Sequence, residues 1–308
     1  GDLEVELICG PDSLWAIVRR DGRGGLAIRC AYLAGPFDCR AARHQAGERL
    51  RVRIKSAMGE HVVALAMPET QPELLRVSVW LTPARPLLVP FLPRDLYPLD
   101  RNDDPTTAQG HVEAAQRGLN SGALFFRIAE PDFGTVLYFQ NLTALNDYYL
   151  ATNTKPDGAV GGEWPELGYL PPTPPQSATP PVETLAAGRE IMLSDALIAI
   201  RGLDDGSEDQ SALQFLRMLG VVYKALDRPE TEFRDWVERS ERTLKDLATA
   251  PEATVRHYGH LYAHPYTASE YPDSMVQLSL LSAIHDWGRW NGTPHPLEKE
   301  FRSGLAKF

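Results

Sequence analysis

The sequence has few cysteines, no long apolar run and no excess of basic residues, and these absences exclude several classes of protein. No stretch approaches the roughly eighteen apolar residues of a membrane-spanning helix. The formal net charge of −10, from 31 basic and 41 acidic residues, would repel the phosphates of nucleic acid. A neutral or cationic ligand meets no such repulsion. We therefore expect a globular protein that binds neither nucleic acid nor a membrane.

The three cysteines, Cys9, Cys30 and Cys39, fall in or beside predicted strands. Such an odd set is typical of buried free thiols, which behave as small hydrophobic residues. A disulfide between Cys30 and Cys39, on either side of a predicted turn, is the alternative. No signal peptide is visible, and free thiols favour the cytoplasm. The start at Gly1 without a methionine leaves open a trimmed chain, and with it a periplasmic or secreted protein.

The first half of the chain has the period-two alternation of half-buried strands. In Arg49–Lys55, Leu50, Val52 and Ile54 lie on one face and basic residues on the other. Similar segments are Leu3–Cys9, Ser13–Arg19, Leu26–Leu33, His61–Met67 and Leu74–Leu81. Because no helical pattern separates them, the order favours an antiparallel β-sandwich over a parallel α/β sheet.

The middle of the chain is less regular. Residues 107–118 predict a short helix or a loop. A hairpin follows, with strands Ala123–Ala129 and Thr135–Gln140, whose apolar residues on both faces indicate a sheet covered on both sides. Repeated prolines between Asn141 and Pro181 exclude a long helix or a central strand, so we expect a long functional loop or linker there. Glu190–Ile200 returns to a strand pattern.

After Arg201 the apolar period changes from two to about 3.6, which is typical of amphipathic helices. The predicted helices cover about 210–226, 229–248, 273–290 and 297–308. Ser207 is a suitable N-cap for the first of them. The acidic run 204–209 lacks the spacing of a calcium-binding loop, and we expect neither a metal nor a cofactor. The change of period predicts a β domain over 1–202 and a helical segment over 203–308.

A polar, aromatic loop precedes the third predicted helix and contains Tyr266, Glu270, Tyr271 and Asp273. A β-rich half followed by long helices, with such a loop before one of them, resembles at the level of architecture the glycoside hydrolases in which a β-sandwich precedes an (α/α) barrel. The resemblance implies a carbohydrate-active protein that acts on an oligo- or polysaccharide, and it identifies no single family.

The resemblance is incomplete, because about four helices are predicted where such a barrel has about six pairs. We therefore expect either the N-terminal part of a glycoside-hydrolase-like enzyme or helices that cap the sandwich. In related architectures the acid and base lie on later barrel loops, so the chain alone is expected to be inactive. The remainder of the same polypeptide, or another subunit, would then cover the helices.

Hydrolysis of a glycoside needs two carboxyl groups, about 5–5.5 Å apart for retention and about 6.5–9.5 Å apart for inversion. Glu270 or Asp273 could supply one, and Glu163 or Glu166 the other if the proline-rich loop folds over the helices. Asp273 also has a structural explanation, because a carboxylate is stabilised in the first turn of a helix.

The predicted sugar contacts are Asp147, Glu163, Trp164, Tyr266, Glu270 and Tyr271. Trp164 lies among glycines and prolines without an apolar period, so we expect an exposed ring that stacks on a sugar. The loop 146–166 is expected to approach 266–273 and form one acidic, aromatic cleft.

The motifs of metal-dependent and nucleophilic catalysis are missing: the sequence has no HExxH, no paired CxxC and no GxSxG. His285 and Asp286 are neighbours on a predicted helix and do not share a face. Trp287 continues an apolar stripe and is predicted to be core.

The competing hypothesis is a non-catalytic module that binds a glycan or a partner and docks through its helices. An unfinished barrel would leave apolar side chains partly exposed, and the candidates are Leu213, Leu216, Leu280 and Leu281. Their complete burial would favour the capped module.

Overall fold

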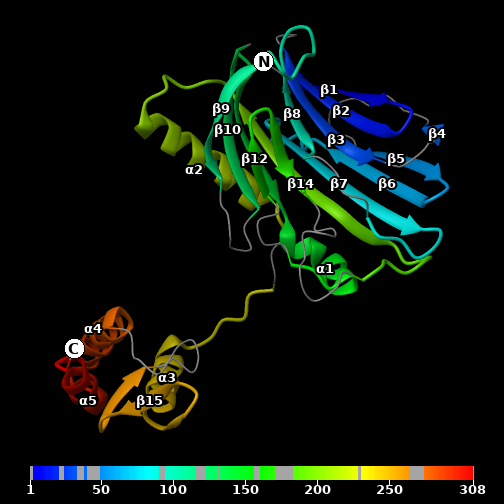
Figure 1. Cartoon of the computed structure of the whole chain (residues 1–308). Helices are drawn as coiled ribbons and strands as arrows, with labels where there is room; N and C mark the ends of the chain where they lie inside the picture. The colour runs from blue at the N-terminus through cyan, green and yellow to red at the C-terminus, as the bar shows by residue number, and fades with distance from the viewer. Residues whose placement is uncertain are drawn as a thin grey trace. The chain divides into compact units, whose positions relative to one another are not determined.

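The computed structural model describes residues 3–20, 24–32, 38–39, 49–89, 94–115, 122–130, 132–155, 160–170, 183–227, 230–263 and 274–307. The chain divides into two compact units, Gly1–Asp227 and Arg228–Phe308. We call them the β unit and the helical unit. As predicted, the first consists mostly of antiparallel strands (Figure 1).

The β unit contains two antiparallel sheets. The six-stranded sheet has the order β1 (Leu3–Cys9), β2 (Ser13–Arg20), β3 (Gly25–Tyr32), β8 (Leu96–Leu99), β13 (Glu166–Tyr169), β12 (Val160–Glu163). The eight-stranded sheet has the order β4 (Asp38–Cys39), β5 (Arg49–Ser56), β6 (Gly59–Ala66), β7 (Leu74–Pro83), β14 (Ile191–Arg201), β11 (Gly134–Gln140), β10 (Ala123–Glu130), β9 (Gln109–Ala115).

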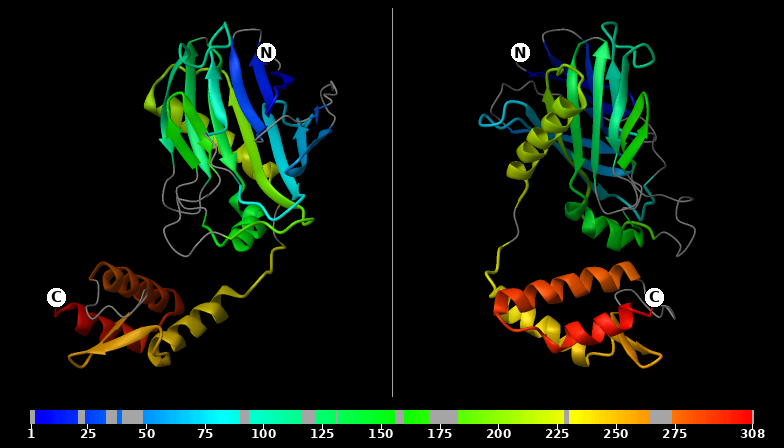
Figure 2. Two further views of the ribbon diagram at one scale, coloured as in Figure 1. Left: turned by 45° about the vertical axis from the view of Figure 1, so that its right-hand side comes forward. Right: turned by 90° about the vertical axis from the view of Figure 1, so that its left-hand side faces the viewer.

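The inner faces of the two sheets share one apolar core, and the sheets form two layers (Figure 2). Leu14 and Ile28 reach the core from the six-stranded sheet, and Val63 and Phe126 reach it from the eight-stranded sheet. Alternate residues on each strand supply these side chains, as the period of two requires.

Helix α2 (Glu208–Ala225) covers the outer face of the eight-stranded sheet. Met218 and Val222 are fully buried against apolar side chains of β10, β11 and β14. Ser207 caps the helix, as predicted, by accepting a hydrogen bond from the backbone of Gln210. The structure divides at Asp227 rather than at the predicted residue 202, because α2 packs on the sheet that precedes it.

Two predictions for the middle of the chain are wrong. Residues 107–118, predicted as helix or loop, contain strand β9. The segment 141–181, predicted as a long loop, contains η1 (Leu142–Leu145), α1 (Asn146–Thr152), β12 and β13. Tyr148 fixes α1 to the core with 1% of its surface exposed, so this segment is tied down by burial.

The cysteines differ from the predictions in part. Cys9 forms a disulfide, whereas Cys30 is free and buried. Burial raises the pKa of the Cys30 thiol to about 12. A buried free thiol is therefore confirmed at Cys30 and wrong at Cys9, and the alternative Cys30–Cys39 disulfide is wrong. A disulfide is rare in the reducing cytoplasm, so the cysteines no longer favour that compartment.

The helical unit contains α3 (Trp236–Thr249), β15 (Thr254–His257), β16 (His260–Ala263), α4 (Ser274–Asn291) and α5 (Pro296–Leu305). Its core includes Leu244, Leu261, Ile284 and Phe301. Helix α3 begins later than predicted, because the carboxylate of Asp235 accepts hydrogen bonds from the first backbone N–H groups of the helix. The hairpin of β15 and β16 was not predicted.

The apolar side chains that we expected at the surface behave differently from one another. Leu216 is 61% exposed and Leu213 is 39% exposed, whereas Leu281 is buried and Leu280 is partly buried. Trp287, predicted as core, is partly buried against the core of the helical unit. In the described part of the chain, no helix is long and apolar enough to span a membrane.

Candidate functional site

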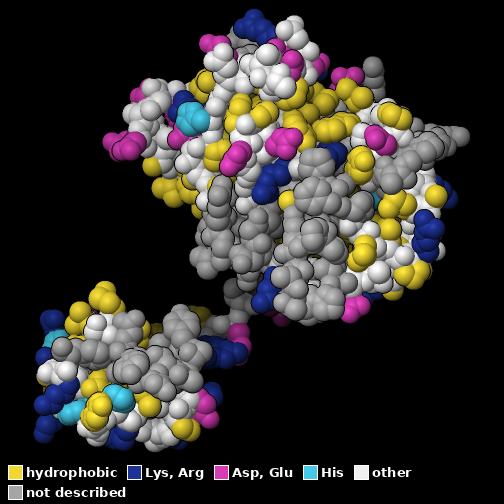
Figure 3. Space-filling view, in the orientation of Figure 1, with side chains coloured by type: hydrophobic (Ala, Val, Ile, Leu, Met, Phe, Trp, Pro, Cys, Tyr) yellow, Lys and Arg dark blue, Asp and Glu magenta, His cyan; other side chains and the backbone are white. Residues whose placement is uncertain are grey.

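A groove lies on the β unit where strands β8, β12 and β13 meet. Its volume is about 750 Å³, within the range of small-molecule sites. The charged, polar and aromatic side chains that line it are Arg94, Tyr97, Thr106, Glu163, Trp164 and Glu166. Hydrophobic side chains gather over β8 and β12, with acidic and basic groups beside them (Figure 3). We call this the β8–β13 groove.

The hairpin of β12 and β13 supplies most of the wall. Glu163 and Glu166 are paired across its two strands, and the turn between them is Trp164-Pro165, joined by a cis peptide bond. Both glutamates are exposed. Two carboxylates directly opposite each other repel. A ligand that donates hydrogen bonds to both would relieve this repulsion.

Trp164 is half-buried, whereas the sequence predicted an exposed ring. Its indole N–H donates a hydrogen bond of 2.9 Å to the carbonyl oxygen of Ala108. The ring lies against Gly110 on β9, where a Cβ atom would come within 2.5 Å of Trp164 Cη2. The glycine therefore allows the indole to pack on the neighbouring sheet while part of it still lines the groove.

Tyr97 lines the groove from β8. It makes an edge-to-face contact with Trp15, with 5.7 Å between ring centroids. Burial raises the pKa of the Tyr97 hydroxyl, the charge of Arg29 opposes this rise, and the charge of Glu166 adds to it. The charge of Glu166 on β13 therefore acts on the hydroxyl of Tyr97 on β8, and both side chains line the groove.

Arg94 fixes the floor of the groove. Its guanidinium donates a hydrogen bond of 2.9 Å to the carbonyl oxygen of Gly168, and its stem lies beside Gly162. Arg94 thus joins the segment before β8 to both strands of the hairpin, and it lines the same groove as the two carboxylates.

Asp95, next to Arg94, is buried, and its side chain connects the segment before β8 to β13. Its carboxylate accepts hydrogen bonds from the backbone N–H of Tyr169 at 2.7 Å and from the hydroxyl of Tyr138 at 3.0 Å. Tyr138 lies on the facing sheet, so this carboxylate joins the two sheets under the groove. Burial raises the pKa of Asp95 to about 6, although these hydrogen bonds and Arg29 lower it.

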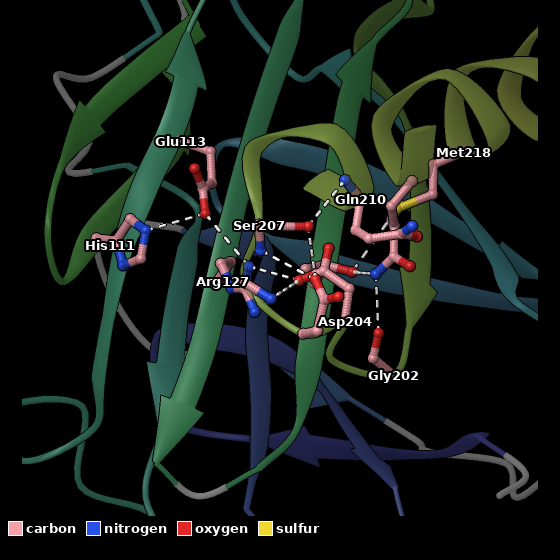
Figure 4. Close-up of polar contacts among 12 residues, drawn as sticks. His111, Glu113, Arg127, Gly202, Asp204, Ser207, Gln210 and Met218 are labelled. Atoms are coloured by element: carbon pink, nitrogen blue, oxygen red, sulfur yellow. Dashed lines mark hydrogen bonds and ion pairs between the residues drawn. The ribbon is translucent and has the colours of Figure 1, made fainter. Parts of the chain in front are cut away.

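A second polar cluster lies on strands β9 and β10, beside the N-terminus of α2 (Figure 4). Arg127 forms an ion pair of 2.7 Å with Asp204 and a longer one of 3.7 Å with Glu113. His111 contacts the same Glu113 oxygen at 3.0 Å. The backbone N–H of Gly206 also donates to Asp204, so the cluster docks the segment before α2 on the sheet. In the described part of the chain no group of side chains has the makeup of a metal site.

The groove brings together three of the predicted site residues, Glu163, Trp164 and Glu166. Asp147 lies on α1, where it pairs with Arg189 at 3.4 Å, and it is not among the residues that line the groove. The other candidates lie outside the described residues: Tyr266, Glu270, Tyr271 and Asp273. The predicted approach of the loops 146–166 and 266–273 therefore stays a prediction.

Sequence reasoning missed Arg94 and Tyr97 because it treated the proline-rich stretch around β8 as irregular. The available signal was weak: in the four residues of β8, Leu96 faces the core and Tyr97 faces outward. Four residues are too few for the alternation to be distinguished from chance.

Comparisons with known proteins found no match: no protein-family model, curated protein or solved structure corresponds to this chain.

Replacing Asp95 with asparagine tests the buried carboxyl under the groove. The folded-state pKa of about 6 lies above the ordinary value near 3.9, so folding favours the protonated form. The stabilisation by this group is complete below about pH 4 and is lost as the pH rises through about 6. Asp95→Asn stays neutral and escapes that loss. We expect its stability relative to the parent to increase by about 2 kcal/mol between pH 4 and pH 7.

The measurement is urea unfolding, followed by far-ultraviolet circular dichroism at several pH values. Asp147→Asn, a change at an exposed carboxylate, is the matched control and should show no such trend. Identical pH dependence in the parent and Asp95→Asn would contradict the prediction.

Proposed function

We propose that the β unit binds an oligo- or polysaccharide in the β8–β13 groove. The observation that carries the proposal is the hairpin that places Trp164 between two exposed carboxylates, in a groove that Tyr97 also lines. Aromatic rings offer flat apolar surfaces to the C–H faces of a sugar. Carboxylates accept charge-assisted hydrogen bonds from sugar hydroxyls, and the guanidinium of Arg94 donates them.

The geometry favours binding over hydrolysis. A general acid must be kept protonated by an apolar environment, whereas Glu163 and Glu166 are exposed to solvent. The non-catalytic glycan-binding module is therefore the function that we infer for the groove. Hydrolysis by a glycoside-hydrolase-like enzyme, with an (α/α) barrel begun by the helical unit, stays a prediction that this groove does not support.

Trp164→Ala is expected to weaken binding of an oligosaccharide by about 1 kcal/mol, or about fivefold, through loss of one aromatic contact. Isothermal titration calorimetry against a panel of glycans measures the change. Trp290→Ala is the control, because Trp290 is 58% exposed on the helical unit and should leave binding unchanged.

Because Trp164 also packs on Gly110, a second variant separates binding from folding. Glu163→Gln keeps the size of an exposed side chain and removes its charge, so it should weaken binding without lowering stability. If the parent binds no glycan, or if both groove variants bind like the parent, the proposed function is wrong.

A further inference from the structure

A second cavity lies between the two sheets of the β unit and shares no lining residue with the β8–β13 groove. Its volume is about 70 Å³. Most of its wall is aliphatic, from Met58, Val79, Leu81, Leu87, Val89 and Leu193. Polar side chains also line it, among them His61, Asp95 and Ser194. An apolar cavity with few polar groups is typical of a small-molecule site.

His61 points into this cavity from β6. It pairs with Leu81 of β7, and it lies on the same face of β6 as Val63 and Leu65, whose side chains belong to the inner core. Its exposed fraction is 4%, and its Nδ1 atom is buried with no hydrogen-bond partner. Buried polar atoms are nearly always hydrogen-bonded, so an unpartnered one that faces a cavity points to a missing partner.

Two other polar side chains of the cavity, Asp95 and Ser194, already have partners. The carboxylate of Asp95 accepts from Tyr169 and Tyr138. The hydroxyl of Ser194 exchanges hydrogen bonds with the side-chain amide of Gln140, at 3.0 and 3.3 Å. His61 Nδ1 and the hydroxyl of Tyr169, which is also buried without a partner, are therefore the atoms in this wall that a ligand would satisfy.

The chemistry of His61 restricts the partner. Burial lowers the pKa of its imidazole to about 4, so the ring is neutral at neutral pH. In a neutral ring Nδ1 is either a donor or an acceptor, according to the tautomer. A hydroxyl group serves both cases because it donates and accepts. Arg29 also lines the cavity, but its charge acts on the carboxylate of Asp95 in the same wall, which would repel an anion.

We propose that this cavity binds the hydroxyl end of a slim aliphatic molecule, with that hydroxyl hydrogen-bonded to Nδ1 of His61. The aliphatic wall suits an unbranched alkyl chain. This cavity has about half the volume of one that admits benzene, about 150 Å³, so it takes the hydroxyl end and first carbons of a narrow chain rather than a ring.

Nuclear magnetic resonance of the full chain with 1-butanol tests the proposal. Methyl-labelled methionine and labelled histidine report on Met58 and His61, which line the cavity. Met275 is the internal control, because it is 69% exposed on the helical unit. We expect saturable shifts of Met58 and His61 signals and only a small linear drift at Met275.

Two comparison compounds use the unmodified protein and need no variant. 1-Chlorobutane has the same chain without a hydroxyl, and tert-butanol has the hydroxyl on a branched body; each should bind about tenfold more weakly than 1-butanol or not at all. Equal shifts for all three compounds would overturn the proposal. So would a lack of saturation with 1-butanol, which would mean that water alone satisfies His61.

The variant pair His61→Gln and His61→Leu adds a direct test of the residue. Glutamine keeps a neutral side chain that donates and accepts, whereas leucine keeps the volume without a polar atom. We expect binding of 1-butanol to persist in the first and to fall about tenfold in the second. Unchanged affinity in His61→Leu would overturn the assignment of His61.

Discussion

Replacing Asp195 with alanine is expected to lower the free energy of unfolding of the β unit by about 3–5 kcal/mol, the usual cost of breaking a buried ion pair by removing one partner. Asp195 lies on β14 and is fully buried. Arg76 of β7 contacts it through two hydrogen bonds of 2.8 Å. Ser78 and Asn141 donate to the same carboxylate at 2.8 and 2.9 Å.

These donors outweigh the cost of burial. Burial alone would raise the pKa of Asp195, but hydrogen bonds from Arg76 and Ser78, with the charge of Arg76, hold it below its ordinary value. Removing the carboxylate leaves one cation and two polar groups without their acceptor, in the strand pair that runs through the centre of the eight-stranded sheet. The loss is therefore large.

A second ion pair between the same two strands provides the control. Arg201 at the end of β14 contacts Glu73, next to β7, at 2.8 Å, and both side chains are about one-third exposed. Glu73→Ala should cost about 1 kcal/mol or less, because solvent screens the pair. Urea unfolding of both variants measures the difference. Equal costs for Asp195→Ala and Glu73→Ala would contradict the argument from burial.

The strands that the sequence predicted best are those with a complete alternation. Arg49–Lys55 was predicted as a half-buried strand, and β5 spans Arg49–Ser56 with Val52 and Ile54 in the core. The apolar residues on both faces of the 123–140 hairpin were predicted to indicate a sheet covered on both sides, and this is confirmed. Phe126 faces the inner core and Phe125 faces α2, so the sheet is covered on both sides.

What the sequence could not provide was the assignment of partners. Helix α2 has an amphipathic pattern, but such a pattern does not say which surface covers the apolar face. The structure shows that Met218 and Val222 pack on the preceding sheet, so the boundary moved to Asp227. Long-range pairing is not visible in a local period.

The residues of the groove also fall into two groups, those that are close in sequence and those that only strand pairing brings together. Glu163, Trp164 and Glu166 are close in sequence, so their common location could be predicted without the fold. Tyr97 and Arg94 join them only because β13 pairs with β8, through the register of Leu167 with Leu96. That pairing links residues about seventy positions apart, and no motif in the sequence encodes it.

Gly168 makes this pairing possible, and Gly168→Ala is expected to cost about 2–6 kcal/mol of stability. Its φ angle of +102° is one that residues with a side chain rarely adopt, which alone costs about 1–3 kcal/mol. An added Cβ would also lie 2.0 Å from Asp95 Oδ1 and 2.9 Å from Leu96 Cγ. Crowding of this kind adds about 1–3 kcal/mol.

The crowding cannot be relieved cheaply, because the hydrogen bonds from Tyr169 and Tyr138 hold the carboxylate of Asp95 in place. Gly206→Ala separates the two contributions. Gly206 has a φ angle of +79°, and nothing lies within 4 Å of an added Cβ, so only the backbone strain applies. Urea unfolding should place Gly168→Ala about 1–3 kcal/mol below Gly206→Ala. If the two variants were equally stable, β8 and β13 would not depend on the close approach of Asp95 to Gly168, and the floor of the groove would be less rigid than this geometry requires.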